Sequence, residues 1–323
     1  MGHALALGVN AKEWYQSKRN TIILSAQDYL DNLVWVHEKL EDYSISGFEN
    51  LKEFLEDEYI RYYEAIYGNY IGSSEIRRIL HEMKKYIPDL AEDMIPDFSL
   101  RTYYLSMQLR GDDPELYQKG YFDYAEYFNA GMEDAINLKV PDSYRHTPGI
   151  VILYYYYHFN SYVRREGMNN IQINVREDYI QAVEKIQKAF QKEISRRGIG
   201  IETNPSSNYL IGTFKDYKKH PITSFYNLGL EVDPDRINEC PQLQVSINTD
   251  DQGVFSTSLE NEYALLASAL ENVQDENREY IYKKQMIYKW LDNIRIMGNE
   301  QSFGNEQYEE YFRINDSGNH NNN

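Results

Sequence analysis

The sequence predicts an α/β fold in which a parallel sheet or barrel is interrupted by a large helical region. Three short segments have the apolar or alternating pattern of buried strands, at Gly2–Gly8, Gly198–Thr203 and Leu243–Asn248. Helical patterns alternate with the last two strands, and this βα order is typical of a parallel sheet. Residues 25–197 are mostly helical in pattern. A long helical region is therefore expected between the first strand and the second.

Capping signals open the helices of this region. They are Ser25, Ser46, Ser73 or Ser74, Asp113-Pro114 and Thr147-Pro148. The last helix is the clearest, because apolar residues recur every three or four positions from Val183 to Ile194 and Gly198 ends it. The sequence therefore predicts a helical insertion over residues 9–197.

The remaining segments complete the expected organisation. A strand at residues 1–8 precedes the insertion, and strands and helices follow it over residues 198–303. Pro205–Lys219 is expected to be a loop, with a short helix after His220-Pro221. Later helices are expected at about Leu259–Glu271 and Asp275–Ile296. Residues 304–323 form a polar, low-complexity tail that is expected to be disordered.

Composition narrows the class of protein. The 323 residues carry a formal net charge of -18, which argues against a protein that binds nucleic-acid backbone generally. The single cysteine, Cys240, can form neither an internal disulfide nor a cysteine-based metal site. A reducing, cytoplasmic setting is therefore expected. The most apolar run, Ile150–Tyr157, is too short to cross a membrane, and the N-terminus lacks a secretory signal pattern.

Polar residues lie within or just beyond the three predicted strands, where parallel folds place their active sites. Asp250 and Asp251 follow the last strand, and adjacent carboxylates cannot both point the same way. One could bind a metal while the other faces a substrate, although a solvated turn is the alternative interpretation. His3 could act as a general base, or it could be a core histidine with a structural partner.

Several motifs, taken in order, resemble the adenosine deaminase family of metal-dependent hydrolases. The string SINTDD at Ser246–Asp251 is similar to the signature around that family's last barrel strand, and Gly2-His3 is similar to its GH motif. Ile201–Asn208 resembles the seventh-strand motif, with Asn204 in place of the usual cysteine. His220-Pro221 matches the family's HP. The later segments Leu259–Leu266 and Asn299–Phe303 resemble its closing helices.

The resemblance implies a fold and a chemistry. The fold would be the C-terminal part of a TIM-type (β/α)8 barrel, with about three strands and a large helical insertion. Asp250 would be a Zn²⁺ ligand and Asp251 would accept a hydrogen bond from a purine. His3 would be the catalytic histidine beside a zinc-bound hydroxide, which would add to the purine carbon and release ammonia. Adenosine, adenine, AMP, ATP and modified purines all remain open as substrates.

The chain also departs from the family pattern. The family's His-X-His pair and its histidine with a glutamate close behind are both missing, since no two of the seven histidines are two positions apart. A catalytic zinc normally has three or more protein ligands. We therefore expect an incomplete site that requires an N-terminal part with those motifs. The expected partners are a purine nucleoside or nucleotide, together with a missing N-terminal half or further copies of this chain in a homo-oligomer. The alternatives are a non-catalytic interaction or assembly protein that retains a relic of the barrel, and an unrelated helical domain with chance motifs.

Overall fold

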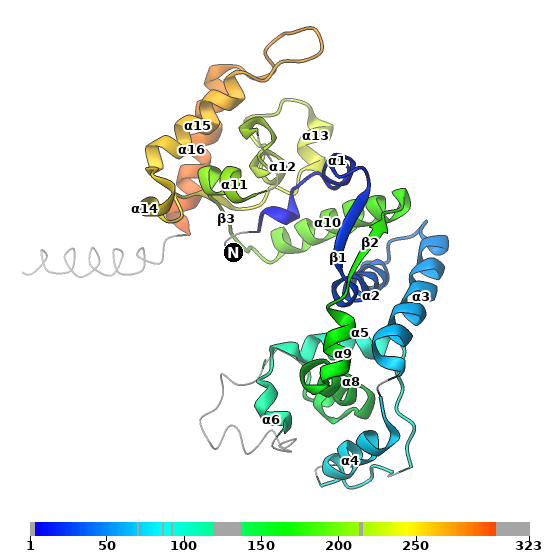
Figure 1. Cartoon of the computed structure of the whole chain (residues 1–323). Coiled ribbons are helices and arrows are strands. Elements are labelled where there is room, and N and C mark those ends of the chain that lie inside the picture. The colour runs from blue at the N-terminus through cyan, green and yellow to red at the C-terminus, as the bar shows by residue number, and fades with distance from the viewer. Residues whose placement is uncertain are drawn as a thin grey trace, which may run out of the picture. The chain divides into compact units, whose positions relative to one another are not determined.

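The structure, a computed structural model, divides into two compact units (Figure 1). Unit 1 comprises Met1–Trp14 and Gln187–Asn323, and unit 2 comprises Tyr15–Ile186. The structure describes residues 4–69, 71–85, 87–91, 93–118, 137, 139–212 and 216–301. The predicted catalytic residue His3 and the predicted tail 304–323 lie outside these ranges.

Unit 2 is mainly helical, with one pair of strands. In chain order its elements, together with the helices α1 and α10 that run into unit 1, are α1 (Ala11–Ser17), β1 (Thr21–Ser25), α2 (Ala26–Asp42), α3 (Glu49–Tyr63), the π-helix η2 (Glu64–Gly68), α4 (Ser73–Met83), α5 (Leu100–Gln108), η3 (Leu109–Gly111), α6 (Pro114–Gln118), η5 (Asp142–His146), α8 (Pro148–Phe159), α9 (Ser161–Gly167), β2 (Asn170–Asn174) and α10 (Glu177–Arg196). The predicted helix starts at Ser25 and at Thr147-Pro148 are confirmed by α2 and α8.

The strands β1 and β2 form an antiparallel pair that the sequence interpretation missed. Thr21 pairs with Asn174 and Ser25 pairs with Asn170, so the ladder closes a loop of some 150 residues. Both strands fall within residues 9–197, which are predicted to be helical. Each strand is only five residues long and contains no fully buried position. Such short strands become recognisable only when the distant partner is known.

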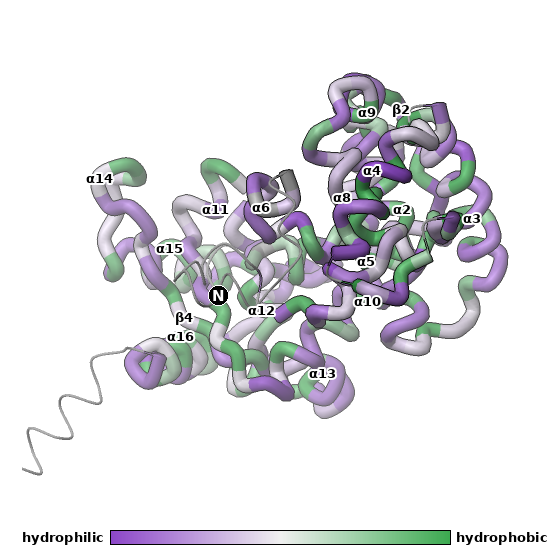
Figure 2. Tube along the Cα trace, turned by 90° about the horizontal axis from the view of Figure 1, so that it is seen from below, coloured by the Kyte–Doolittle hydropathy of each residue, from purple (hydrophilic) through white to green (hydrophobic). Residues whose placement is uncertain are grey.

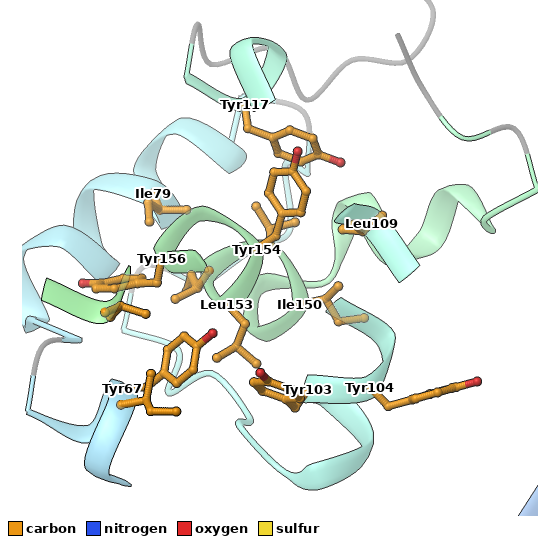
Figure 3. Packing of buried hydrophobic residues seen from close by; sticks show 14 of the residues in the cluster. Tyr67, Ile79, Tyr103, Tyr104, Leu109, Tyr117, Ile150, Leu153, Tyr154 and Tyr156 are labelled. Carbon is orange, nitrogen blue, oxygen red and sulfur yellow. The ribbon is translucent and has the colours of Figure 1, made fainter. Parts of the chain in front are cut away.

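The core of unit 2 is built around α8, which buries apolar and aromatic residues on every side (Figure 3). Ile150, Leu153 and Tyr154 are at most 1% exposed. The Tyr154 hydroxyl donates to the main-chain oxygen of Asp112 at 2.9 Å, and the Tyr117 hydroxyl donates to Asp112 Oδ2 at 2.6 Å. Each tyrosine ring therefore packs in the core while its hydroxyl group donates a hydrogen bond. This explains how the core can contain so many tyrosines.

A buried ion pair joins two segments of this core. Arg145 Nε and Nη2 donate to Asp112 Oδ2 and Oδ1, both at 2.9 Å, and the two side chains are 6% and 0% exposed. Arg145 Nη2 also donates to the main-chain oxygen of Asn137 at 3.1 Å. This bidentate geometry compensates both buried charges, so removal of either partner would leave the other uncompensated.

Unit 1 contains a pair of strands surrounded by helices. Its further elements are η1 (Leu5–Leu7), β3 (Ile201–Thr203), α11 (Pro205–Ile211), η6 (Tyr217–Lys219), α12 (Ile222–Phe225), α13 (Pro234–Glu239), β4 (Val245–Ile247), α14 (Gln252–Phe255), α15 (Leu259–Glu271) and α16 (Lys284–Glu300).

The strands β3 and β4 are parallel, as predicted. Ile201 pairs with Val245 and Thr203 pairs with Ile247. Their apolar side chains pack into a core with Phe225 and Trp290, both fully buried. The described residues of unit 1 thus have a βα order with a two-stranded parallel sheet, and they do not close a barrel. Over this part of the chain, the fold is mostly helical with few strands.

Three local predictions in unit 1 differ from the structure. Leu5–Leu7 forms a 3-10 helix instead of a strand. The Leu7 N–H donates to the Ala4 carbonyl oxygen at 3.1 Å, and the Ala6 carbonyl oxygen accepts from Gln187 Nε2 at 2.6 Å, so these groups are not available to a neighbouring strand. Pro205–Ile211 is the helix α11 instead of a loop, because Pro205 stands at its first turn with a preset backbone angle. The last predicted helix also starts later, at Lys284.

Polar and apolar residues are interspersed along most of the helices of both units (Figure 2). Among the described residues, no helix has the length and apolar character needed to span a membrane.

Candidate functional site

The carboxyl ends of β3 and β4 lie side by side and open into a group of polar side chains. Thr203 Oγ1 donates to the Ser246 carbonyl at 2.8 Å, and Asn248 N donates to the Thr203 carbonyl at 2.9 Å. These bonds fix the register at the strand ends. The residues that follow each strand are therefore brought together, although they are more than 40 positions apart in the sequence.

Asp250 contacts the segment that follows β3. Ser207 Oγ donates to Asp250 Oδ2 at 2.8 Å, and the Asp251 N–H donates to Asp250 Oδ1 at 3.0 Å. Asp250 has a φ of 57°, a left-handed conformation that is uncommon outside glycine, asparagine and aspartate. The structure thus joins the predicted metal ligand to the predicted seventh-strand motif.

Asp251 points to different partners from Asp250. It is the N-cap of α14, and its Oδ1 accepts from the main-chain N–H groups of Gly253 at 2.9 Å and Val254 at 3.1 Å. The side chain is exposed. Because both contacts use Oδ1, Oδ2 has no hydrogen-bond partner among the described residues and remains available to an external donor.

His220 is a buried, neutral histidine next to this site. The Ile222 N–H donates to His220 Nδ1 at 3.1 Å, so the ring proton resides on Nε2, which donates to Asn208 Oδ1 at 3.2 Å. Burial lowers the pKa of His220 to about 3. Asn208 Oδ1 also accepts from the Asn204 N–H at 3.0 Å, so His220 stabilises the turn that begins α11.

Glu262 links the segments that follow the two strands. It is fully buried, and its carboxylate accepts from the Ser206 N–H at 2.8 Å and from Thr257 Oγ1 at 2.6 Å. The sequence interpretation gave neither Glu262 nor His220 a place at the site. For Glu262 a signal was present, because it lies on the helix face that Leu266 and Leu270 also occupy, where a carboxylate must have buried partners.

The described residues do not provide a complete metal site. No group of three or more histidine, cysteine, aspartate or glutamate side chains within these ranges could hold a metal ion. Asp250 is the one predicted ligand that the structure places, and a catalytic zinc normally needs at least three. The residues present therefore do not fit a catalytic zinc by themselves.

Comparison with known proteins identifies the segment that carries this site. A family profile described as adenosine deaminase matches residues 173–294. This segment is adenosine deaminase-like. It includes β3, β4 and α15, and therefore the polar residues at both strand ends.

Individual relatives of the adenosine deaminase-like segment are similar over short stretches. An adenine deaminase of Sinorhizobium medicae (strain WSM419) is 29% identical over 79 residues, which is 24% of this chain and 20% of that protein. An adenosine deaminase of Plasmodium gallinaceum is 34% identical over 83 residues, which is 25% of this chain and 19% of that protein. The chain therefore spans about a fifth of the length of these curated relatives.

Proposed function

We propose that the adenosine deaminase-like segment forms the C-terminal part of the active site of a purine-deaminating hydrolase. The observation that carries this proposal is the contact between Ser207 and Asp250, which joins two family motifs at the carboxyl ends of parallel strands. Relatives that share the segment are named adenine deaminase and adenosine deaminase. The reaction would hydrolyse a C–N bond of a purine base, nucleoside or nucleotide and release ammonia.

The geometry supports distinct roles for the two aspartates. Asp250 would contribute one zinc ligand, because a carboxylate oxygen that accepts a hydrogen bond, as from Ser207, can still bind a metal through a further lone pair. Asp251 would accept a hydrogen bond from the purine through Oδ2, while the cap that it forms on α14 fixes its orientation. His3 would be the catalytic histidine that acts as general base on the attacking water.

The remaining ligands would come from an N-terminal part or another polypeptide that carries His-X-His and His…Glu motifs. Zinc, when bound, would supply Lewis-acid activation of water. Of the described residues, Asp250 would supply one of the side chains that bind the zinc, and Asp251 would orient the purine.

The test uses the full chain, alone and co-expressed with a polypeptide that carries both missing motifs. Zinc per chain and ammonia release from adenine, adenosine and AMP are measured. We expect bound zinc and ammonia release in the complemented sample. Asp250→Asn should lose the zinc, and Asp251→Asn should keep the zinc but release ammonia at least about a hundredfold more slowly.

Asp233→Asn is the matched control, since Asp233 caps α13 in the same way by accepting from the Asp235 N–H at 3.0 Å. It should leave both measurements unchanged. The proposal is wrong if the complemented, folded Asp250→Asn variant holds as much zinc as the complemented native chain, or if Asp233→Asn has the same effect as Asp251→Asn.

A non-catalytic interaction or assembly protein is the second candidate. It is favoured by the missing ligand set within the described residues and by the structural bonds that Asp250 and Asp251 already make. A chain that is monodisperse in size-exclusion chromatography, and that binds no more zinc than its Asp250→Asn variant under every condition, would support this candidate instead.

A further inference from the structure

A cavity in unit 2 is separate from the deaminase-like segment. Its volume is ≈ 470 Å³, within the range of small-molecule sites. Its lining residues come from the start of α2, the end of α8, and α9 with the residue that follows it. The lining includes Asp28, Tyr157, His158, Val163, Arg164 and Met168.

Arg164 brings a positive charge to this cavity. Its side chain is exposed, and its guanidinium group forms no ion pair or hydrogen bond with any residue that the structure describes. The next residue, Arg165, differs, because its Nη2 donates to Glu166 Oε1 at 2.9 Å. In a chain with a net charge of -18, an arginine that lines a cavity without a counter-ion is an available site for an anionic group.

Asp28 brings the opposite charge to the same cavity. Ser25 Oγ donates to Asp28 Oδ2 at 2.7 Å, and Asp28 N donates to Ser25 Oγ at 3.0 Å, so the carboxylate is held in place at the start of α2. Asp28 Oδ1 has no partner within the described ranges. Asp28 and Arg164 also form no ion pair with each other, so each charge is available to a ligand.

Apolar and aromatic residues complete the lining of the cavity. Val163 is 1% exposed, whereas Met168 is 74% exposed and presents a flexible thioether. The Arg110 guanidinium covers the Tyr157 ring at 3.8 Å and is itself held by Asp31, which fixes the ring in the wall. Burial, with Arg110 and Arg164 nearby, lowers the pKa of His158 to about 4, so this histidine adds no charge at neutral pH.

We propose that this cavity binds a small amphoteric molecule with an anionic group and an amino group on an apolar body. The anionic group would bind Arg164, the amino group would donate to Asp28 Oδ1, and the apolar body would pack against Tyr157, Val163 and Met168. A ligand of this kind is complementary to both unpaired charges of the cavity. A ligand with only an anionic group would be repelled by the Asp28 carboxylate, and a ligand with only a cationic group would be repelled by Arg164.

On the full chain, the test compares three probes that share a phenylethyl core. They are L-phenylalanine, 3-phenylpropionate, which lacks the amino group, and phenethylamine, which lacks the carboxylate. Binding is followed by NMR of ¹³C-methyl methionine, with the Met168 signal assigned through Met168→Leu. We expect L-phenylalanine to shift the Met168 signal saturably and to bind at least about tenfold more tightly than either analogue.

Two variants and one control assign the contacts. Arg164→Gln should weaken L-phenylalanine binding about tenfold and leave phenethylamine binding unchanged, whereas Asp28→Asn should weaken L-phenylalanine and leave 3-phenylpropionate unchanged. Arg165→Gln is the matched control and should change nothing. The proposal is overturned if no probe shifts the Met168 signal, if the three probes bind equally, or if Arg165→Gln weakens binding as much as Arg164→Gln.

Discussion

Replacing His220 by glutamine is expected to remove a pH-dependent part of the stability of unit 1. In the unfolded chain a histidine has a pKa near 6.5, whereas burial lowers the pKa of His220 in the folded chain to about 3. Protonation therefore favours the unfolded state. The stabilisation is complete above pH 6.5 and is lost progressively as the pH falls toward 3.

The magnitude follows from these two pKa values. Each pH unit between them costs about 1.4 kcal/mol, so lowering the pH from 7 to 4.5 should reduce the free energy of unfolding of unit 1 by about 2.5 kcal/mol through His220 alone. His220→Gln keeps a donor for Asn208 Oδ1 but cannot titrate. The variant should therefore lose about 2.5 kcal/mol less than the native chain over the same pH interval.

Urea unfolding at pH 7 and pH 4.5 measures this difference. Trp290 is buried in unit 1 and can report its unfolding by fluorescence once Trp14 and Trp35 are replaced by phenylalanine. Substitution of the exposed His81 by glutamine is the control and should follow the native chain. An equal pH dependence in the His220→Gln variant and the native chain would refute a buried, neutral His220.

Two further predictions concern buried carboxylates. Glu262→Ala should lower the free energy of unfolding of unit 1, measured in urea, by about 2–4 kcal/mol, because the Ser206 N–H and the Thr257 hydroxyl lose their acceptor. The control is Glu260→Ala at an exposed position of the same helix, which should change this free energy by about 0.5 kcal/mol or less. Arg145→Met should lower the free energy of unfolding of unit 2 by about 3–5 kcal/mol, because it leaves the Asp112 carboxylate buried without a counter-charge. The loss should be smaller when Asp112→Asn is added, and an equal loss in the double variant would contradict the ion pair.

Local signals explain which parts of the fold the sequence could predict. Ser25 indicates the start of α2 because its side chain caps the helix, and Pro148 indicates the start of α8 because proline fits the first helical turn. The strands β3 and β4 follow from the alternating pattern of their own residues. By contrast, β1 and β2 depend on a pairing across some 150 residues, and Leu5–Leu7 depends on which distant side chains take its carbonyls. Neither relation has a local signature.

The site divides in the same way. That Asp250 would lie near the segment after β3 follows from the rule that parallel strands end at one edge, and the Ser207 contact agrees with it. The network of Glu262 and His220 could not be derived, because a buried carboxylate or imidazole is tolerated only where specific donors and acceptors meet it. Those partners come from segments far apart in the sequence.

The network also decides how the proposed functions can be separated. His220 and Glu262 stabilise the turn after β3 and the segment after β4 through hydrogen bonds, and Ser207 holds the Asp250 carboxylate. A carboxylate that is already held in place lowers the entropic cost of assembling a metal site. This is compatible with the proposal that Asp250 binds zinc together with ligands from another polypeptide. The same contacts would stabilise unit 1 equally well in a protein that never binds zinc. Stability measurements on His220 and Glu262 therefore cannot distinguish the two functions, and only bound zinc and released ammonia, compared between Asp250→Asn and Asp233→Asn, can do so.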